Sequence, residues 1–151
     1  MIHILERVQV IPGPVKRVWA YFATPENLNE LTPPDMKFTI LRRESLGRMY
    51  AGQLIEYRVE FIPGLRSRWL TEIAHVNEGH YFVDEQRIGP YRFWYHEHIF
   101  EVEGSGVRMT DRVTHEVGFG FLGELLYKLW IEKRLAAIFD HRVRKIKEIF
   151  G

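Results

Sequence analysis

The sequence contains no cysteine, which excludes disulfide bonds and thiolate metal sites and fits a reducing compartment. It also has no uninterrupted apolar run approaching the roughly 18 residues of a membrane-spanning helix. Neither sign of charge dominates, because 21 Lys and Arg residues are balanced by 20 Asp and Glu residues. Such a balance gives no field that would select nucleic acid or an anionic membrane. Because the first residues also resemble a strand rather than a signal peptide, we expect a soluble cytoplasmic protein without nucleic-acid partners or integral membrane association.

A chain of 151 residues is long enough for one domain with a substantial core. The spacing of its apolar residues predicts one strand, two short helices, six strands and a long helix. The predicted strands are 2–10, 36–43, 52–61, 67–76, 80–87, 94–103 and 107–117, and the predicted helices are 15–23, 25–31 and 121–150. Strands joined by short turns form an antiparallel sheet, which should curve around a long amphipathic helix. The predicted fold class is therefore α+β: residues 1–151 form a single domain with a seven-stranded curved antiparallel sheet, and any space left under the helix becomes a pocket.

The two strands of the last predicted hairpin carry polar residues on their apolar face. Successive side chains of a strand point to opposite faces, so one face of this hairpin contains Trp94, His96, His98, Phe100 and Val102 together with Val107, Met109, Asp111, Val113, His115 and Val117. A two-residue turn at Gly104-Ser105 then places His98 opposite Asp111 and Trp94 opposite His115. Polar groups inside a sheet indicate a lined cavity rather than a dry core.

These polar residues form the candidate site, which contains His96, His98, Asp111 and His115, with Asp84, Gln86 and Glu6 from other strands. One interpretation is general acid–base catalysis by His98 and Asp111, since a carboxylate fixes the tautomer of an imidazole and raises its pKa. Another is a metal site with His96, His98 and Asp111 as ligands. The interpretation that we prefer is a polar network that lines a cavity and orients a ligand, without a metal or a cofactor.

Other strands follow the same alternation. The first is expected to turn Ile2, Ile4, Val8 and Val10 inward, with Glu6 on that face, and the strand 67–76 is expected to turn Trp69, Thr71, Ile73 and His75 inward. The aromatic residues Tyr57, Phe61, Trp69, Phe82, Trp94 and Phe100 share the inner face and suit a flat or apolar ligand.

The predicted apolar stripe of the long helix consists of Leu125, Leu129, Glu132, Ala136, Phe139, Val143, Ile146 and Phe150. Only Glu132 interrupts it, so this carboxylate either forms a salt bridge at the edge or faces the cavity. Arg142 either pairs with Asp84 or is solvated. The predicted ligand-binding residues are thus Tyr57, Trp69, Phe82, Asp84, Gln86, Trp94, His96, His98, Phe100, Asp111, His115 and Glu132.

Residues 118–123 match the pattern G-x-G-x-x-G between a strand and a helix, as dinucleotide-binding sites do. No second parallel strand follows to carry the carboxylate that binds ribose. We therefore expect these glycines to bend the chain into the last helix.

Several segments resemble a known superfamily. They are FVDEQ at 82–86, GPY at 89–91, WYHEH at 94–98, MTDRV at 109–113, LG at 122–123 and FDHR at 139–142. With the order of the elements, they resemble the START, polyketide-cyclase and pollen-allergen superfamily (SRPBCC), and in particular its uncharacterised ligand-binding branch. The resemblance implies a helix-grip fold with an elongated cavity between the sheet and the C-terminal helix. It does not imply a reaction.

The expected function is the binding or carrying of a hydrophobic or amphipathic small molecule in that cavity. Two alternatives remain open. One is a non-covalent cyclase or dehydratase that uses His98 and Asp111, and the other is a protein-interaction module similar to the co-chaperones of the superfamily. A solid core without a cavity would favour the interaction module.

Overall fold

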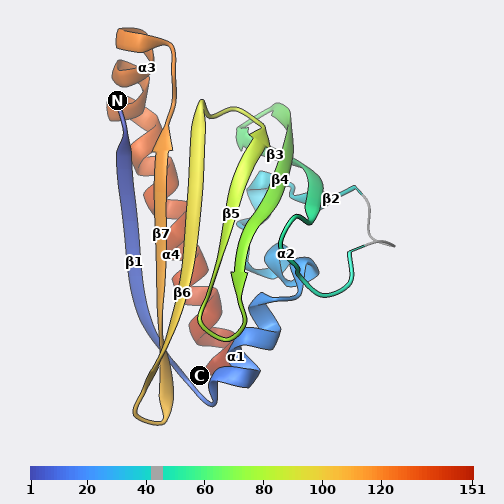
Figure 1. The fold of residues 1–151 in the computed structure, drawn as a ribbon. Coiled ribbons are helices and arrows are strands. Elements are labelled where there is room, and N and C mark those ends of the chain that lie inside the picture. Colours follow the sequence, from blue (N-terminus) through green and yellow to red (C-terminus); the bar gives the residue numbers. More distant parts are fainter. Residues whose placement is uncertain (42–45) are drawn as a thin grey trace.

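The computed structural model describes residues 1–41 and 46–151, and its strands form one seven-stranded sheet (Figure 1). The strands are β1 (His3–Pro12), β2 (Thr39–Ile40), β3 (Leu54–Ile62), β4 (Leu65–Asn77), β5 (Tyr81–Ile88), β6 (Phe93–Glu103) and β7 (Gly106–Glu116). They are antiparallel throughout, in the order β1-β7-β6-β5-β4-β3-β2. The predicted α+β class is therefore confirmed. The predicted strand 36–43 is reduced to Thr39–Ile40, and its residues 42 and 43 lie outside the described residues.

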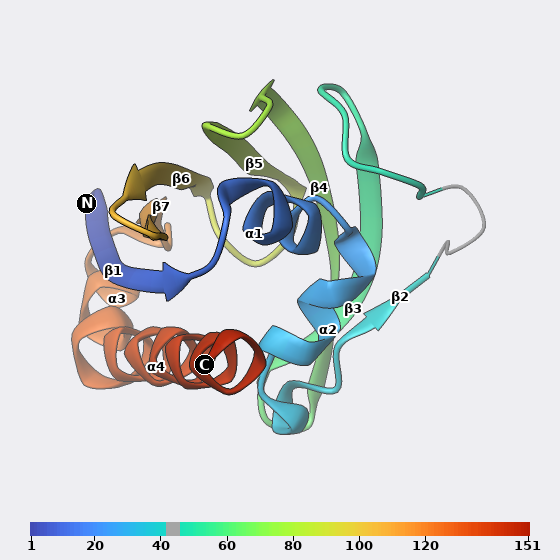
Figure 2. The ribbon, with the colours of Figure 1, turned by 90° about the horizontal axis from the view of Figure 1, so that it is seen from below.

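Helices close the open side of this curved sheet (Figure 2). They are α1 (Val15–Phe22), the 3-10 turn η1 (Pro25–Asn27), α2 (Leu28–Leu31), the 3-10 turn η2 (Pro34–Met36), α3 (Gly120–Leu126), the π-helical turn η3 (Tyr127–Ile131) and α4 (Glu132–Phe150). The buried residues Val18, Trp19 and Phe22 lie on one face of α1, as their spacing predicts. Within the described ranges, none of these helices is both long enough and apolar enough to cross a membrane.

The β6–β7 hairpin has the predicted register. His98 lies opposite Asp111 and Trp94 lies opposite His115. Gly104, at the first position of the two-residue turn, has φ of 60°, which is a conformation that glycine adopts without strain. The predicted inner residues are buried, except for Val102, which is exposed near the tip of the hairpin.

The face assignment of β1 is wrong. The outer face of this strand exposes Ile2, Ile4, Glu6, Val8 and Val10. The pairing with β7 decides the orientation, because it places Leu5 opposite the fully buried Val113 and Glu6 opposite Arg112. Glu6 then accepts a hydrogen bond from Arg112 at 2.8 Å on the solvent side of the sheet, the face opposite the candidate site. Apolar residues occupy both faces of β1, so its sequence alone does not show which face is buried.

His75 is exposed rather than turned inward, although Trp69, Thr71 and Ile73 on the same strand are buried as predicted. The pairing of β4 with β5 shifts between Ile73 and His75. An irregularity of this kind inserts a residue and reverses the alternation that follows.

The buried stripe of the C-terminal helix differs from the predicted one in its first half. It consists of Tyr127, Ile131, Leu135, Phe139, Arg142 and Ile146. The predicted members Leu125, Leu129 and Glu132 are exposed. The π-helical turn Tyr127–Ile131 is wider than an α-turn, so residues four apart stay on one face through it. Glu132 consequently presents its carboxylate to solvent and not to the interior.

The glycines of residues 118–123 turn the chain from β7 into α3, as expected. Gly118 has φ of 86°. A Cβ on Gly123 would lie 1.7 Å from the carbonyl oxygen of Gly118, so only glycine fits there. A dinucleotide site needs parallel strands flanking the helix, whereas every strand pair that the structure describes is antiparallel.

Candidate functional site

A cavity of about 180 Å³ lies between the inner face of the sheet and the helices. Seven of the predicted ligand-binding residues line it: Tyr57, Trp69, Phe82, Asp84, Trp94, His96 and His98. The opposite wall comes from residues that the sequence did not predict as site residues, including Phe22, Leu31, Met36, Leu135 and Ile138. Most of these residues are apolar, so polar groups occupy only a small part of the wall.

Five predicted site residues lie outside this lining: Gln86, Phe100, Asp111, His115 and Glu132. Gln86 instead holds the turn between β5 and β6, since its amide donates to the carbonyl of Tyr91 at 2.6 Å and accepts from the Tyr91 N–H at 3.0 Å. Phe100 packs against Trp19 and Phe22 beneath α1. These side chains support the wall of the cavity without forming it.

His115 is fully buried and belongs to a separate contact with the C-terminal helix. Its Nδ1 lies 3.3 Å from the carbonyl oxygen of Val113, and its Nε2 lies 3.3 Å from the Tyr127 hydroxyl. The first nitrogen therefore donates and the second accepts, which fixes a neutral tautomer. Its role in the structure is to join β7 to η3.

This contact leads to a prediction about pH. Burial lowers the pKa of His115, the backbone hydrogen bond to Val113 opposes this shift, and the nearby His3 adds to it. The stability that His115 contributes is complete above the unfolded-state pKa of about 6.5 and is lost as the pH falls below it, because only the unfolded chain then takes up the proton. We expect urea unfolding to show a smaller loss of stability for His115→Gln than for the wild type between about pH 7 and pH 5. Equal losses would contradict this prediction.

Asp84, His96, His98, Asp111 and Arg142 form a buried polar network beside the cavity. Strand register brings four of them together, because Asp84 on β5 pairs with His96 on β6, and His98 pairs with Asp111 on β7. The fifth, Arg142, reaches the network from α4. One carboxylate thus lies on each side of the two imidazoles.

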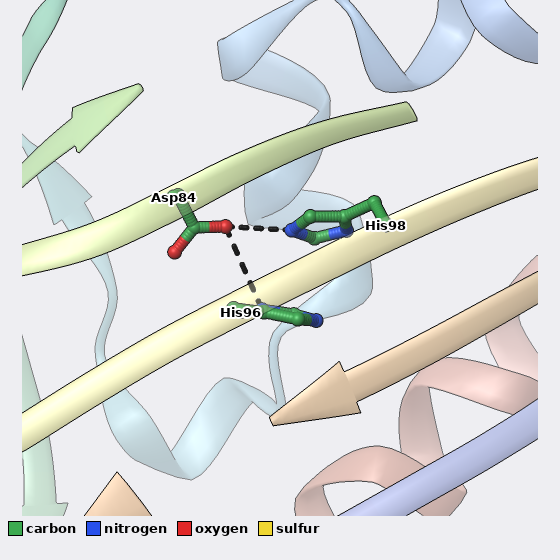
Figure 3. A group of neighbouring side chains, drawn as sticks. All are labelled: Asp84, His96 and His98. Atoms are coloured by element: carbon green, nitrogen blue, oxygen red, sulfur yellow. Dashed lines mark hydrogen bonds and ion pairs between the residues drawn. The ribbon is translucent and has the colours of Figure 1, made fainter. Parts of the chain in front are cut away.

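The two imidazoles contact both carboxylates. The Nε2 of His98 lies 2.6 Å from Oδ2 of Asp84, and its Nδ1 lies 3.2 Å from Oδ1 of Asp111. The Nε2 of His96 lies 2.9 Å from that same Oδ1, and its Nδ1 lies 3.6 Å from Oδ2 of Asp84. Figure 3 shows Asp84 facing the two rings. The predicted His98–Asp111 contact is therefore present, and the contact of His98 with Asp84 is shorter.

Arg142 also belongs to the network, and the sequence did not identify Asp111 as its partner. Its Nε donates to Oδ2 of Asp111 at 3.0 Å, and the residue is only 5 % exposed, so it is neither solvated nor hydrogen-bonded to Asp84. A signal was present: Arg142 follows Phe139 by three residues and precedes Ile146 by four, which is the spacing of one helix face. A buried carboxylate such as Asp111 also needs a cation.

The charges of the network compensate each other. Burial raises the pKa of Asp111, but Arg142 and the two imidazoles outweigh burial and hold that pKa well below its ordinary value. Burial also raises the pKa of Asp84, but His96 and His98 outweigh burial and lower that pKa overall. Burial lowers the pKa of His98, but hydrogen bonds to Asp111 and Asp84 raise it overall. Burial and the charge of His98 lower the pKa of His96, which stays neutral. Both carboxylates are therefore ionised, and each contacts the two imidazoles, while Asp111 also contacts the guanidinium of Arg142.

A second polar contact lies on the cavity wall. The hydroxyls of Tyr57 and Thr71 are 2.8 Å apart, and both residues line the cavity. Burial raises the pKa of Tyr57, so its hydroxyl stays protonated and is able to donate. The cavity thus combines an apolar wall with a charged, hydrogen-bonded patch and one neutral hydroxyl pair.

No protein-family profile matches the chain, and no curated protein matches it. Solved structures do resemble it. TTHA0849 from Thermus thermophilus is 21% identical, with a TM-score of 0.67 over 97% of this chain and 95% of that one. The Zhui aromatase/cyclase from Streptomyces sp. R1128 is 12% identical, with a TM-score of 0.70 over 97% of this chain and 94% of that one. Ara h 8.0201 is 14% identical, with a TM-score of 0.65 over 98% of this chain and 99% of that one.

The long C-terminal helix, the curved seven-stranded sheet and these similarities agree with the resemblance found in the sequence. The chain therefore has the helix-grip fold of the START, polyketide-cyclase and pollen-allergen superfamily, SRPBCC.

Proposed function

We propose that this protein binds an apolar or amphipathic small molecule in the cavity between its sheet and its C-terminal helix. The observation that supports this most directly is the composition of the cavity wall, where aromatic and aliphatic residues surround one charged patch. Wide apolar contact with a few polar anchors is typical of small-molecule sites. Asp84, His96 and His98 would orient the polar end of the ligand, and Tyr57, Trp69, Phe82 and Trp94 would contact its apolar part. The absence of cysteine supports a reducing, cytoplasmic location.

The geometry favours binding over acid–base chemistry. A cyclase or dehydratase would need an imidazole nitrogen that is free to exchange a proton with its substrate. Both ring nitrogens of His98 contact carboxylates of the protein, and Asp111 lies outside the cavity lining. The network is thus better arranged to present a fixed pattern of charge than to transfer protons. The presence of a cavity also argues against an interaction module with a solid core.

The amphipathic fluorophore 1-anilinonaphthalene-8-sulfonate tests this proposal. We expect saturable binding of one probe per chain, with increased fluorescence as its rings enter the cavity. Ile138 on α4 lines the cavity and is only partly buried, so the Ile138→Trp substitution should fill the space without disrupting the fold. Binding should weaken at least about tenfold, which corresponds to about 1.4 kcal/mol.

Ala137→Trp is the matched control, because Ala137 is the preceding residue of the same helix and is exposed. It adds the same indole on the solvent side and should leave probe affinity within about twofold. Urea unfolding verifies that both variants are folded. Probe binding that is unchanged in Ile138→Trp, or not saturable in the wild type, would be evidence against a ligand site in the cavity. Native mass spectrometry of the protein purified from its own host would then identify the class of any retained ligand.

A further inference from the structure

We propose that Asp84, His96 and His98 form a binding site for one divalent transition-metal ion at the edge of the cavity. This inference goes beyond the binding of an apolar molecule and does not depend on it. Each of the three residues offers a ligand atom, and these atoms lie within 4.8 Å of one another. Within the described ranges, this is the one group of three or more His and acidic residues with such spacing.

The strand geometry makes the three ligand atoms converge. His96 and His98 are two residues apart on β6, so their side chains extend from the same face of the sheet. Their ring centroids are 3.7 Å apart. Asp84 lies on the adjacent strand β5, and its Oδ2 is 2.6 Å from Nε2 of His98 and 3.6 Å from Nδ1 of His96. Figure 3 shows the carboxylate facing both imidazoles.

Asp111 holds both imidazoles in the orientation that a metal requires. Its Oδ1 accepts a hydrogen bond from Nε2 of His96 at 2.9 Å and lies 3.2 Å from Nδ1 of His98, and these are the ring nitrogens farther from Asp84. Nη2 of Arg142 also lies 3.4 Å from Nδ1 of His98. The opposite nitrogens, Nδ1 of His96 and Nε2 of His98, face Asp84. An ion that displaces the proton from Nε2 of His98 would meet a lone pair on each ring. Arg142 in turn fixes Asp111 by donating to Oδ2 at 3.0 Å. A carboxylate that orients a ligating imidazole from behind is a common feature of metal sites.

The site is also accessible from one side. Asp84, His96 and His98 all line the cavity, whereas Asp111 behind them does not. Three protein ligands leave at least one coordination position free, and this position faces the cavity. A site of three protein ligands with an open position is the arrangement of catalytic zinc centres, in contrast to the closed four-ligand structural ones.

The donor set narrows the choice of metal. Two imidazoles and one carboxylate suit Zn²⁺ or Fe²⁺ rather than Mg²⁺ or Ca²⁺, which prefer sites built from oxygen atoms. The ion would replace the proton between Asp84 and His98 and would separate these two atoms to about 3.3 Å, since tetrahedral zinc has bonds of about 2.0–2.1 Å to nitrogen and oxygen.

The charges suggest what completes the coordination. With both imidazoles neutral, Asp84, Asp111 and Arg142 together carry one negative charge. A divalent ion therefore leaves one positive charge in a buried place, where an uncompensated charge is unfavourable. A hydroxide, or the carboxylate of an amphipathic ligand, would neutralise this charge at the open position.

Titration with metal ions tests the proposal on the wild-type chain. After treatment with a chelator and its removal, we expect calorimetry to detect one tightly bound Zn²⁺ per chain. Co²⁺ should bind to the same site and give visible absorption bands that Zn²⁺ abolishes. The melting temperature should rise with the concentration of Zn²⁺, because the ion binds only the folded state with high affinity.

Substitutions then locate the ion. Asp84→Asn keeps the shape of the side chain but removes its charge, and His96→Gln removes one ligand, so each should weaken Zn²⁺ binding at least about tenfold. Asp111→Asn should weaken it about 10–100-fold, as loss of a residue that orients ligands does. His3→Gln is the control. His3 lies 3.1 Å from Glu124, and this pair is another His–carboxylate contact that could bind an ion, but it lies outside the cavity lining. It should leave affinity and stoichiometry unchanged.

Two results would overturn the proposal. One is that the wild-type chain binds Zn²⁺ no more tightly than the Asp84→Asn variant does. The other is that His3→Gln abolishes binding, which would place the ion at the N-terminus of β1. If a buried variant fails to fold, the titration of the wild-type chain still tests the proposal, because a wild-type chain that binds no Zn²⁺ would overturn it. Binding of the fluorescent probe is measured separately from binding of Zn²⁺. A negative result in one measurement therefore does not contradict the proposal that the other measurement tests.

Discussion

Asp111→Ala is expected to lower the free energy of unfolding of the metal-free protein by about 3–5 kcal/mol. Asp111 is buried and contacts three cationic or hydrogen-bonding partners, namely His96, His98 and Arg142. Its removal leaves the guanidinium of Arg142 in the interior without a hydrogen-bonding partner of opposite charge. The penalty of an uncompensated buried charge is far larger than the net contribution of a surface ion pair.

Urea unfolding in the presence of a chelator measures this effect, and a double substitution separates its causes. Asp111→Leu combined with Arg142→Met replaces the ion pair by apolar groups, and it should be less destabilising than Asp111→Ala alone. Glu101→Ala removes an exposed carboxylate from β6 and should change stability by less than about 0.5 kcal/mol. A loss below about 1 kcal/mol for Asp111→Ala would mean that water reaches Arg142 and solvates it.

Phe100→Ala should lower the free energy of unfolding by a similar amount, about 3–5 kcal/mol, for a different reason. The ring of Phe100 is 2 % exposed, and its centroid lies 5.2 Å from that of Trp19, 5.5 Å from that of Phe22 and 6.2 Å from that of Phe82. These rings join α1 to the sheet. Truncation to alanine removes their contacts and leaves a void that a close-packed core cannot fill by relaxation alone.

Phe93→Ala is the matched control for this prediction, since Phe93 lies on β6 as well but is 41% exposed. It should cost less than about 1 kcal/mol. Because Phe100 does not line the cavity, its truncation should lower stability with little effect on the affinity for the fluorescent probe at temperatures where the protein stays folded. A tenfold loss of affinity with unchanged stability would instead place Phe100 in the ligand site.

The β6–β7 hairpin shows what local pattern predicts well. Its two strands alternate cleanly between apolar and polar faces, and a two-residue turn fixes their register. Face and register together place His98 opposite Asp111 without knowledge of any other element. The same holds for the order of the consecutive strands β2 to β7, because short turns leave antiparallel neighbours as the simplest topology.

The errors have a shared physical cause. The first strand carries apolar residues on both faces, so only its pairing with β7 decides that Leu5 is inside and Val8 is outside. The shift in pairing after Ile73 exposes His75, and the π-helical turn at Tyr127–Ile131 exposes Glu132. Each irregularity changes the period of the pattern by about one residue, so a constant alternation assigns the residues beyond it to the wrong face.

The sequence by itself determined the class of the fold, the order of the consecutive strands β2 to β7 and the inward direction of His96, His98 and Asp111, because these depend on alternation and on short turns between consecutive elements. Only the tertiary structure decided that Asp84 meets His98 and Asp111 meets His96, that Arg142 reaches Asp111, and which residues line the cavity. These contacts join β5, β7 and α4, and the approach of elements so far apart in the chain depends on packing of the whole core rather than on any local period.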